Sequence, residues 1–389
     1  MSVTAPRGFV ATGGSAGIKA GKVPDVAVVA TADGRAVPAA GVFTANLAAA
    51  APVQVSRVHL AATAGAAAGV ILTSGNANAA TGEPGRSAAE RLCVAVAGEI
   101  GSTAEEILVC QTGLIGIPFP IEHVLPELEP IVMARGGTGR DAANAARAIM
   151  TTDTVPKEAV VAGDGFTVGA MAKGAAMLAP NMATMLALCT TDAVVDAATL
   201  RQALREAVAA SFNTMTVDGC TSTNDTVLVL ASGHGSSPTP AALTAALTDA
   251  CRSLAEQMVD DAEGATKVSH VHVRGAESDD AAHQAARKVA GSVLVQCSLF
   301  GEDPYWGRVV SELGSAGTLF DIDRVTVAYG GTVVCAAGVA VPHDEAAVAA
   351  HMAGRHIVLE CDLGLGSGQA VVLGTDLSYG YIDENRTTS

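Results

Sequence analysis

The stretch from residue 173 to residue 192 contains Thr184, whose hydroxyl is the most specific candidate for a reactive group in the sequence. No charged residue lies between Lys173 and Asp192, and a Pro-Asn pair marks a turn between two apolar segments. A threonine hydroxyl is a weak nucleophile unless a base lies beside it. An N-terminal threonine obtains that base from its own α-amine. Thr184 would acquire this chemistry if the chain were cut between Ala183 and Thr184, which the small preceding residue and the turn would assist.

Thr184 also has an ordinary interpretation, since a threonine in a buried strand is usually a packed β-branched residue. Other chemical patterns are weaker. The Gly-Gly-Ser-Ala-Gly run at 13–17 lacks the long buried strand that precedes a nucleophile elbow, so a glycine-rich loop is the better interpretation. His270 and His272 would share a strand face, but no third ligand lies nearby in sequence. The glycine-rich run 364–368 lacks the residues that follow it in a nucleotide-binding loop.

Composition restricts the class of protein. The 389 residues are 49% apolar but only 3% aromatic, so we expect a core of Ala, Val and Leu in close layers of helix and sheet. A formal charge of -16 argues against nucleic-acid binding, which needs clustered Lys and Arg. The sequence shows neither a signal-peptide pattern nor an apolar run long enough for a membrane, so we expect a soluble cytoplasmic protein. The eight cysteines lack metal-site spacing and are expected to be core residues of a reducing compartment.

The order of apolar runs predicts the elements that must position Thr184. Short apolar runs bounded by Gly, Asp and Asn predict strands at 25–30, 69–74, 107–110, 166–172, 226–231, 268–273, 325–328, 333–336 and 357–363. Apolar residues at helical spacing predict helices at 85–100, 141–150, 196–211, 241–261 and 281–290. A polar break at 277–280 suggests that a smaller α/β lobe, residues 277–389, follows the main part of the chain.

Together the blocks around Thr184 resemble a known family. Lys173-Gly174, with the run Pro-Asn-Met-Ala-Thr-Met-Leu at 180–186, is similar to the self-cleavage motif of the ornithine acetyltransferase family, also called glutamate N-acetyltransferase, of arginine biosynthesis. Further similar blocks follow in the same order at 17–20, 41–44, 74–79, 111–116, 149–153, 222–226, 261–264 and 306–308. The resemblance therefore covers nearly the whole chain.

The resemblance implies a precursor that cleaves itself before Thr184, giving an α-chain of residues 1–183 and a β-chain of residues 184–389 that assemble as α2β2. The implied fold is a layered α/β/β/α-type sandwich with N-terminal-nucleophile-like chemistry, plus a smaller C-terminal α/β lobe. In this arrangement residues 1–183 and 184–276 build the catalytic sandwich.

The implied reaction is a ping-pong transfer without a cofactor or a metal. Thr184 takes the acetyl group from N-acetylornithine, and glutamate then accepts it. Thr112 and Gly113 match the oxyanion hole, which suits a strand that ends in an amide-exposing glycine turn. The substrate contacts that the resemblance carries over are Thr151 or Thr152, Lys173, Glu263, Asn385 and Ser389. Lys173 would bind a carboxylate and Glu263 an ammonium group.

Two departures from the family pattern and several alternatives accompany this interpretation. Tyr305 stands where the family usually has asparagine, and Ser389 follows Asn385 by four residues where the family places a hydroxyl after five. The same nucleophile would make an aminopeptidase or amidase if water were the acceptor. An uncleaved amino-acid-binding protein is a further alternative, and acetyl-CoA is a possible second donor. A solvated carboxylate at a helix end is the ordinary interpretation of Glu263.

Overall fold

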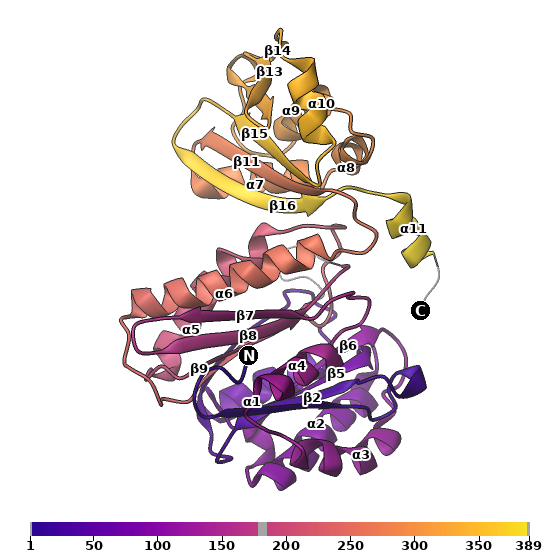
Figure 1. The fold of residues 1–389 in the computed structure, drawn as a ribbon, viewed down its shortest axis with the longest axis vertical. Helices are drawn as coiled ribbons and strands as arrows, with labels where there is room; N and C mark the ends of the chain where they lie inside the picture. Colours follow the sequence, from indigo (N-terminus) through magenta and orange to yellow (C-terminus); the bar gives the residue numbers. More distant parts are fainter. Residues whose placement is uncertain (1, 178–184, 387–389) are drawn as a thin grey trace.

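The computed structural model describes residues 2–177 and 185–386, which form three β-sheets and the helices that cover them. Two of the sheets are stacked in the lower part of Figure 1, and the third lies in a separate lobe at the top. All eight cysteines are free and most are buried, which agrees with their expected place in the core.

The first sheet has four strands and carries Thr112 and Gly113 on its last strand. Its first three strands pair antiparallel, and the fourth pairs parallel with the third. In spatial order they are β1 (Phe9–Gly14), β2 (Val26–Thr31), β5 (Gly69–Asn76) and β6 (Ile107–Leu114). Two helices pack their apolar sides against its outer face, α2 (Gly82–Ile100) and α3 (Ile121–Met133).

The second sheet has six strands and contains both segments that flank Thr184. Its strands in spatial order are β4 (Ala66–Ala67), β3 (Val37–Phe43), β10 (Thr226–Ala231), β9 (Leu186–Thr191), β8 (Thr167–Lys173) and β7 (Lys157–Ala162). Two helices cover its outer face, α5 (Ala197–Ala209) and α6 (Pro240–Asp260). Asp196 caps α5 by accepting hydrogen bonds from the Ala198 and Thr199 amides, at the start of the helix expected at 196–211.

Apolar side chains of the two sheets meet in one buried layer. Val29 and Leu72 of the first sheet lie in the same cluster as Met171, Leu188 and Leu228 of the second. At the margins, α1 (Ala51–Ala62) packs on β6 and α4 (Gly139–Ala148) packs on β1. The layer order is therefore helix, sheet, sheet, helix, which confirms the expected α/β/β/α sandwich (Figure 1).

The smaller C-terminal α/β lobe is built on the third sheet. Its strands in spatial order are β14 (Val339–Ala340), β13 (Thr332–Ala336), β12 (Thr326–Tyr329), β15 (His356–Asp362), β11 (Val268–Ala276) and β16 (Gly368–Thr375). The helices of the lobe are α7 (Asp279–Ala290), α8 (Val293–Phe300), α9 (Trp306–Gly314) and α10 (Glu345–Met352). Because β11 belongs to this sheet, the sheet begins at Val268, and the polar break at 277–280 covers the connection between β11 and α7 and the first two residues of α7.

The last helix, α11 (Tyr379–Asn385), lies apart from the third sheet in Figure 1. Gly264, which follows α6, packs against the backbone of Gly380 and Tyr381, so closely that a Cβ atom at residue 264 would meet the Tyr381 nitrogen at 2.1 Å. Ser378 donates a further hydrogen bond to the carbonyl of Gly264. Helix α11 is thereby held beside the loop that carries Glu263.

Candidate active site

The end of β6 places Thr112 and Gly113 beside the parallel strand β5. Thr112 pairs with Ser74 and Gly113 with Gly75. Gly113 has a φ of 128°, and a Cβ atom there would lie 2.3 Å from the carbonyl carbon of Gly75. Only glycine fits such a close approach of two backbones. The glycine-dependent turn expected from the sequence is therefore present, with the Thr112 side chain buried beside it.

Lys173 ends β8 and brings a cation from the second sheet to Thr112 of the first. Its side chain is buried, and its Nζ atom donates a hydrogen bond of 3.4 Å to Thr112 Oγ1. In the register of the second sheet Lys173 lies opposite Leu186, the first residue of β9. Burial lowers the pKa of the Lys173 ammonium, an effect that the nearby Asp153 carboxylate opposes. The structure thus joins two residues that the sequence predicted separately for the site.

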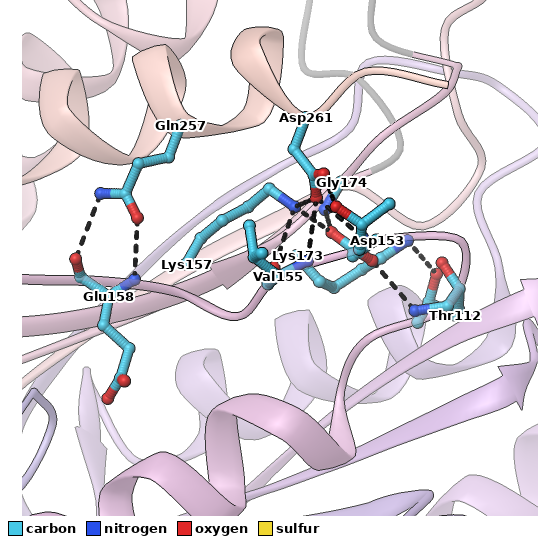
Figure 2. A network of polar contacts seen from close by, with 11 residues as sticks. Thr112, Asp153, Val155, Lys157, Glu158, Lys173, Gly174, Gln257 and Asp261 are labelled. Carbon is cyan, nitrogen blue, oxygen red and sulfur yellow. Dashed lines mark hydrogen bonds and ion pairs between the residues drawn. The ribbon is translucent and has the colours of Figure 1, made fainter. Parts of the chain in front are cut away.

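A buried ion network lies behind Lys173, and Figure 2 shows its members. Lys157 Nζ contacts Asp153 Oδ1 at 2.7 Å and Asp261 Oδ2 at 2.6 Å, and neither the lysine nor Asp153 has an exposed side chain. Asp153 also accepts a hydrogen bond of 2.8 Å from the Gly174 amide. Burial would raise the pKa of Asp153, but the charges of Lys173 and Lys157 lower it to about 2. Asp153 is therefore ionised, pairs directly with Lys157, and acts on Lys173 through its charge.

We expect Lys157→Met to destabilise the fold, because the change leaves Asp153 and Asp261 without the cation that lies between them. Breaking a buried pair in this way costs about 3–5 kcal/mol in the free energy of unfolding. Urea unfolding followed by circular dichroism measures the loss. The matched control is Lys288→Met, which removes a partly exposed pair with Glu312 and should cost less than about 1 kcal/mol. Equal losses for the two variants would contradict the structural role of Lys157.

Glu263 and Asn385 are joined although they are far apart in the sequence. Asn385 Nδ2 donates to Glu263 Oε2 at 2.8 Å, and the Glu263 amide donates to the Ala175 carbonyl at 2.9 Å. Glu263 is 9% exposed, so it is not the solvated helix-end carboxylate of the ordinary interpretation. The Glu263 amide contacts Ala175, two residues after Lys173, and the Glu263 charge acts to raise the pKa of Lys173, so the carboxylate lies in the neighbourhood of the Lys173 ammonium.

The connection between α4 and β7 contains the two threonines predicted as substrate contacts. The Thr151 amide donates to Asp153 Oδ2 at 2.9 Å, while Thr152 is exposed. Thr151 is therefore tied to the network behind Lys173, and the neighbouring Thr152 side chain is open to solvent.

The start of β9 is the nearest described part of the chain to the predicted nucleophile. Ala183, Thr184 and Ser389 lie outside the described residues, so their predicted roles stay predictions. The next residue, Met185, is buried, and its amide donates to Asp225 Oδ1 at 3.0 Å.

Three polar residues near these elements, Lys19, Asp218 and Asp225, have no role predicted from the sequence. Lys19 Nζ donates to the Met150 carbonyl at 2.5 Å, and its pKa is lowered by burial and by Lys173, with Asp25 and Asp153 opposing. Asp218 accepts hydrogen bonds from the Met177 amide and from the Tyr381 hydroxyl. Lys19 and Asp225 fall inside the similar blocks at 17–20 and 222–226, but spacing gives no reason to select them.

The other candidates of the sequence have structural explanations. A Cβ atom at Gly13 would lie 2.2 Å from the Asn144 carbonyl oxygen, so this glycine allows β1 and α4 to approach closely. His270 Nε2 lies 3.2 Å from His356 Nδ1, on the neighbouring strand. Tyr305 is exposed at the start of α9 in the C-terminal lobe, and its ring lies 5.7 Å from the Arg308 guanidinium. Among residues 2–177 and 185–386 no group of three His, Cys, Asp or Glu side chains could hold a metal ion.

Stacked sheets covered by helices define the chain as an α/β-sandwich protein, and the buried Lys173 beside the Thr112 hydroxyl lies at the glycine turn that ends β6. The model of the ArgJ family matches residues 10–387. The chain therefore belongs to the ArgJ family.

Known relatives extend over the whole chain. An arginine biosynthesis bifunctional protein ArgJ from Mycolicibacterium paratuberculosis is 48% identical over 398 residues, which cover 100% of this chain and 96% of the relative. One from Thermobifida fusca is 44% identical over 390 residues, which cover 100% of both chains. A crystal structure of an ornithine acetyltransferase complexed with ornithine, from Mycobacterium tuberculosis, matches with a TM-score of 0.44 and 42% identity, covering 46% of this chain and 94% of that one. In the part of the chain that the structure describes, no helix has the length and apolar character of a membrane span.

Proposed function

We propose that the chain moves the acetyl group of N-acetylornithine to glutamate, through an acetyl ester on Thr184, after cleaving itself between Ala183 and Thr184. Membership of the ArgJ family over residues 10–387 and the names of the relatives, which place them in arginine biosynthesis, support the pathway. The observation that best supports the proposed chemistry is the contact of Lys173 Nζ with Thr112 Oγ1. Lys173 lies opposite Leu186, the first residue of β9, so this contact lies near the strand that follows Thr184.

The proposed transfer has two halves. The α-amine of Thr184 takes the hydroxyl proton while Oγ1 attacks the acetyl carbonyl carbon, and the developing oxyanion accepts hydrogen bonds from Thr112 and Gly113. The intermediate collapses, the ornithine nitrogen takes the proton, and ornithine leaves. The amine of glutamate then attacks the ester, and Thr184 recovers its hydroxyl proton.

Charges of opposite sign fit the two ends of an amino-acid substrate. Lys173 offers a buried cation to the substrate carboxylate, and Glu263 offers a carboxylate to an ammonium group. Asn385 orients Glu263 through their hydrogen bond. In this proposal Thr151 or Thr152 and Ser389 complete the contacts to the substrate, and no cofactor takes part.

The proposed assembly is an α2β2 enzyme in the cytoplasm. Its α-chain would be residues 1–183 and its β-chain residues 184–389. The two chains would share the second sheet, because β8 lies before the proposed cut and its neighbour β9 lies after it.

Purified protein incubated with N-acetylornithine and glutamate should produce ornithine and N-acetylglutamate in equal amounts. Mass spectrometry of both products measures the transfer, and N-terminal sequencing should find a second terminus that begins Thr-Met-Leu-Ala. Reactions without glutamate measure the transfer to water, which an amidase would prefer. A parallel reaction with acetyl-CoA tests the second donor. A correctly cleaved chain that transfers nothing to glutamate would contradict the proposal, and a single uncleaved chain would favour a binding protein.

A further inference from the structure

The loop at 261–267 links the sandwich to the C-terminal lobe, because it lies between the end of α6 and the start of β11. It carries two carboxylates of the candidate site. Asp261 Oδ2 contacts Lys157 Nζ at 2.6 Å, and the Glu263 amide donates to the Ala175 carbonyl at 2.9 Å. The place of Glu263 therefore depends on how the backbone of this loop is held.

Arg355, an exposed residue just before β15 in the C-terminal lobe, closes this loop. Its Nη1 atom donates hydrogen bonds to the carbonyls of Ala265 and Thr266, at 3.2 and 3.3 Å. Its Nη2 atom donates to the carbonyl of Asp260, the last residue of α6. The carbonyl of Arg355 accepts a hydrogen bond of 2.7 Å from the Val268 amide. One guanidinium group thus joins the end of α6 to the last part of the loop.

The chemistry of an arginine side chain suits these contacts. Carbonyl groups at the C-terminus of a helix lack partners within the helix and carry partial negative charge. The last turn of α6 contains no basic residue of its own, so Arg355 supplies the cation. A guanidinium group is a rigid planar fork with donors on different nitrogen atoms, so it can bond carbonyls at both ends of the loop at once. The side chain therefore fixes the separation of those ends.

Other contacts hold the loop at single points. Asp376 accepts hydrogen bonds of 2.9 Å from the Thr266 and Lys267 amides, which lie at the end of the loop. Ser378 donates to the carbonyl of Gly264, in its middle. Neither contact reaches the end of α6. Loss of the guanidinium group should therefore loosen the first half of the loop, which carries the two carboxylates, and leave its last residues fixed.

We propose that Arg355 is a positioning residue, which places the Glu263 carboxylate for the ammonium group of the substrate. This inference rests on the proposed function, because Glu263 binds that ammonium group there. The hydrogen bonds of Arg355 reach backbone carbonyls of the loop and the end of α6, so its effect on Glu263 passes through the backbone. Loss of binding that is equal in the ground state and the transition state raises KM and leaves kcat unchanged.

The test is a kinetic comparison of Arg355→Met with the unchanged enzyme. The substitution keeps a long unbranched side chain and removes every donor. We expect the KM for N-acetylornithine to rise about tenfold, the lower end of what a hydrogen bond to a charged group contributes. The kcat should stay within about threefold. The matched control is Arg324→Met, at an exposed arginine of the same lobe that donates to the Gly364 carbonyl at 3.1 Å, and its KM should be unchanged.

A double-mutant cycle separates positioning of Glu263 from a general effect on the fold. Glu263→Gln alone should raise the KM for N-acetylornithine at least about tenfold, because it removes the charge that binds the ammonium group. In that background Arg355→Met should raise KM by less than about twofold more, since the carboxylate that it positions is already gone. A general loss of folded enzyme would instead act equally in both backgrounds. Circular dichroism shows that each variant is folded.

An unchanged KM in Arg355→Met or in Glu263→Gln would overturn the inference. The same rise in KM from Arg355→Met in both backgrounds would overturn it too, because the residue would then act independently of Glu263. Lack of acetyl transfer to glutamate by the unchanged, cleaved enzyme is a different result. It would contradict the proposed function itself, and the inference with it.

Discussion

A chain with Thr184→Ala should stay a single polypeptide of 38.7 kDa and should lose acetyl transfer by at least about a thousandfold. The change removes the hydroxyl that both proposed reactions use, the attack on the Ala183 carbonyl and the attack on the acetyl group. Self-cleavage and turnover are therefore lost together. A denaturing gel measures the first loss, and the release of ornithine from N-acetylornithine measures the second.

Two variants make this result specific. Thr184→Ser keeps a hydroxyl and should retain part of the cleavage and of the transfer. Thr199→Ala removes a threonine hydroxyl that hydrogen-bonds Asp196 on the surface of α5, and it should behave as the unchanged chain. If the chain with Thr184→Ala is processed normally, another residue is the nucleophile.

Elements whose apolar residues form a short run or repeat at helical spacing could be predicted from the sequence. The strand expected at 226–231 is β10 with the same bounds, and the helix expected at 241–261 is α6 (Pro240–Asp260). Strand β10 is a short continuous apolar run because its two faces are buried in two different clusters, whereas α6 repeats its apolar residues with helical spacing because it buries one face. The strand expected at 107–110 is longer in the structure, because β6 continues to Leu114 through the glycine turn.

Two elements with a proline beyond their first residue, α3 and β3, were missed. Helix α3 (Ile121–Met133) carries Pro126 and Pro130, and these residues normally argue against a helix interior. Packing of Val124 and Leu128 against the first sheet and α2 compensates for this. Strand β3 includes Pro38, where it pairs only with the two-residue strand β4 on one side. In both cases tertiary contacts override the local preference, which a single sequence does not reveal.

The candidate site also combines residues that the sequence indicates with contacts that only the structure shows. Lys173 and Thr112 could be selected from blocks of the sequence, but their contact depends on the stacking of two sheets, since it joins residues 61 positions apart. The partners of Lys157 lie on either side of it in the chain, and Asp261 is 104 positions away. Asp225 gave no signal, because an aspartate before a strand is usually a turn residue. Only its burial and its contact with Met185 distinguish it.

Lys173→Met should lower kcat/KM for N-acetylornithine by about 100-fold or more while leaving the fold intact. The substitution keeps a long unbranched side chain and removes the cation proposed to bind the substrate carboxylate. A hydrogen bond to a charged group contributes about 1.5–3 kcal/mol, which corresponds to about a 10- to 150-fold change in KM. Loss of the Nζ contact with Thr112 Oγ1 should lower kcat in addition, because the proposed oxyanion donor loses its orientation.

The fold should tolerate Lys173→Met because Asp153 keeps Lys157 at 2.7 Å and the Gly174 amide at 2.8 Å. This separates the two buried lysines: Lys157→Met should act mainly on stability, and Lys173→Met mainly on the reaction. Steady-state kinetics on cleaved enzyme and urea unfolding of the same preparations measure both effects, with Lys288→Met as the common control. A kcat/KM within threefold of the unchanged enzyme would show that Lys173 supports the network and does not bind substrate.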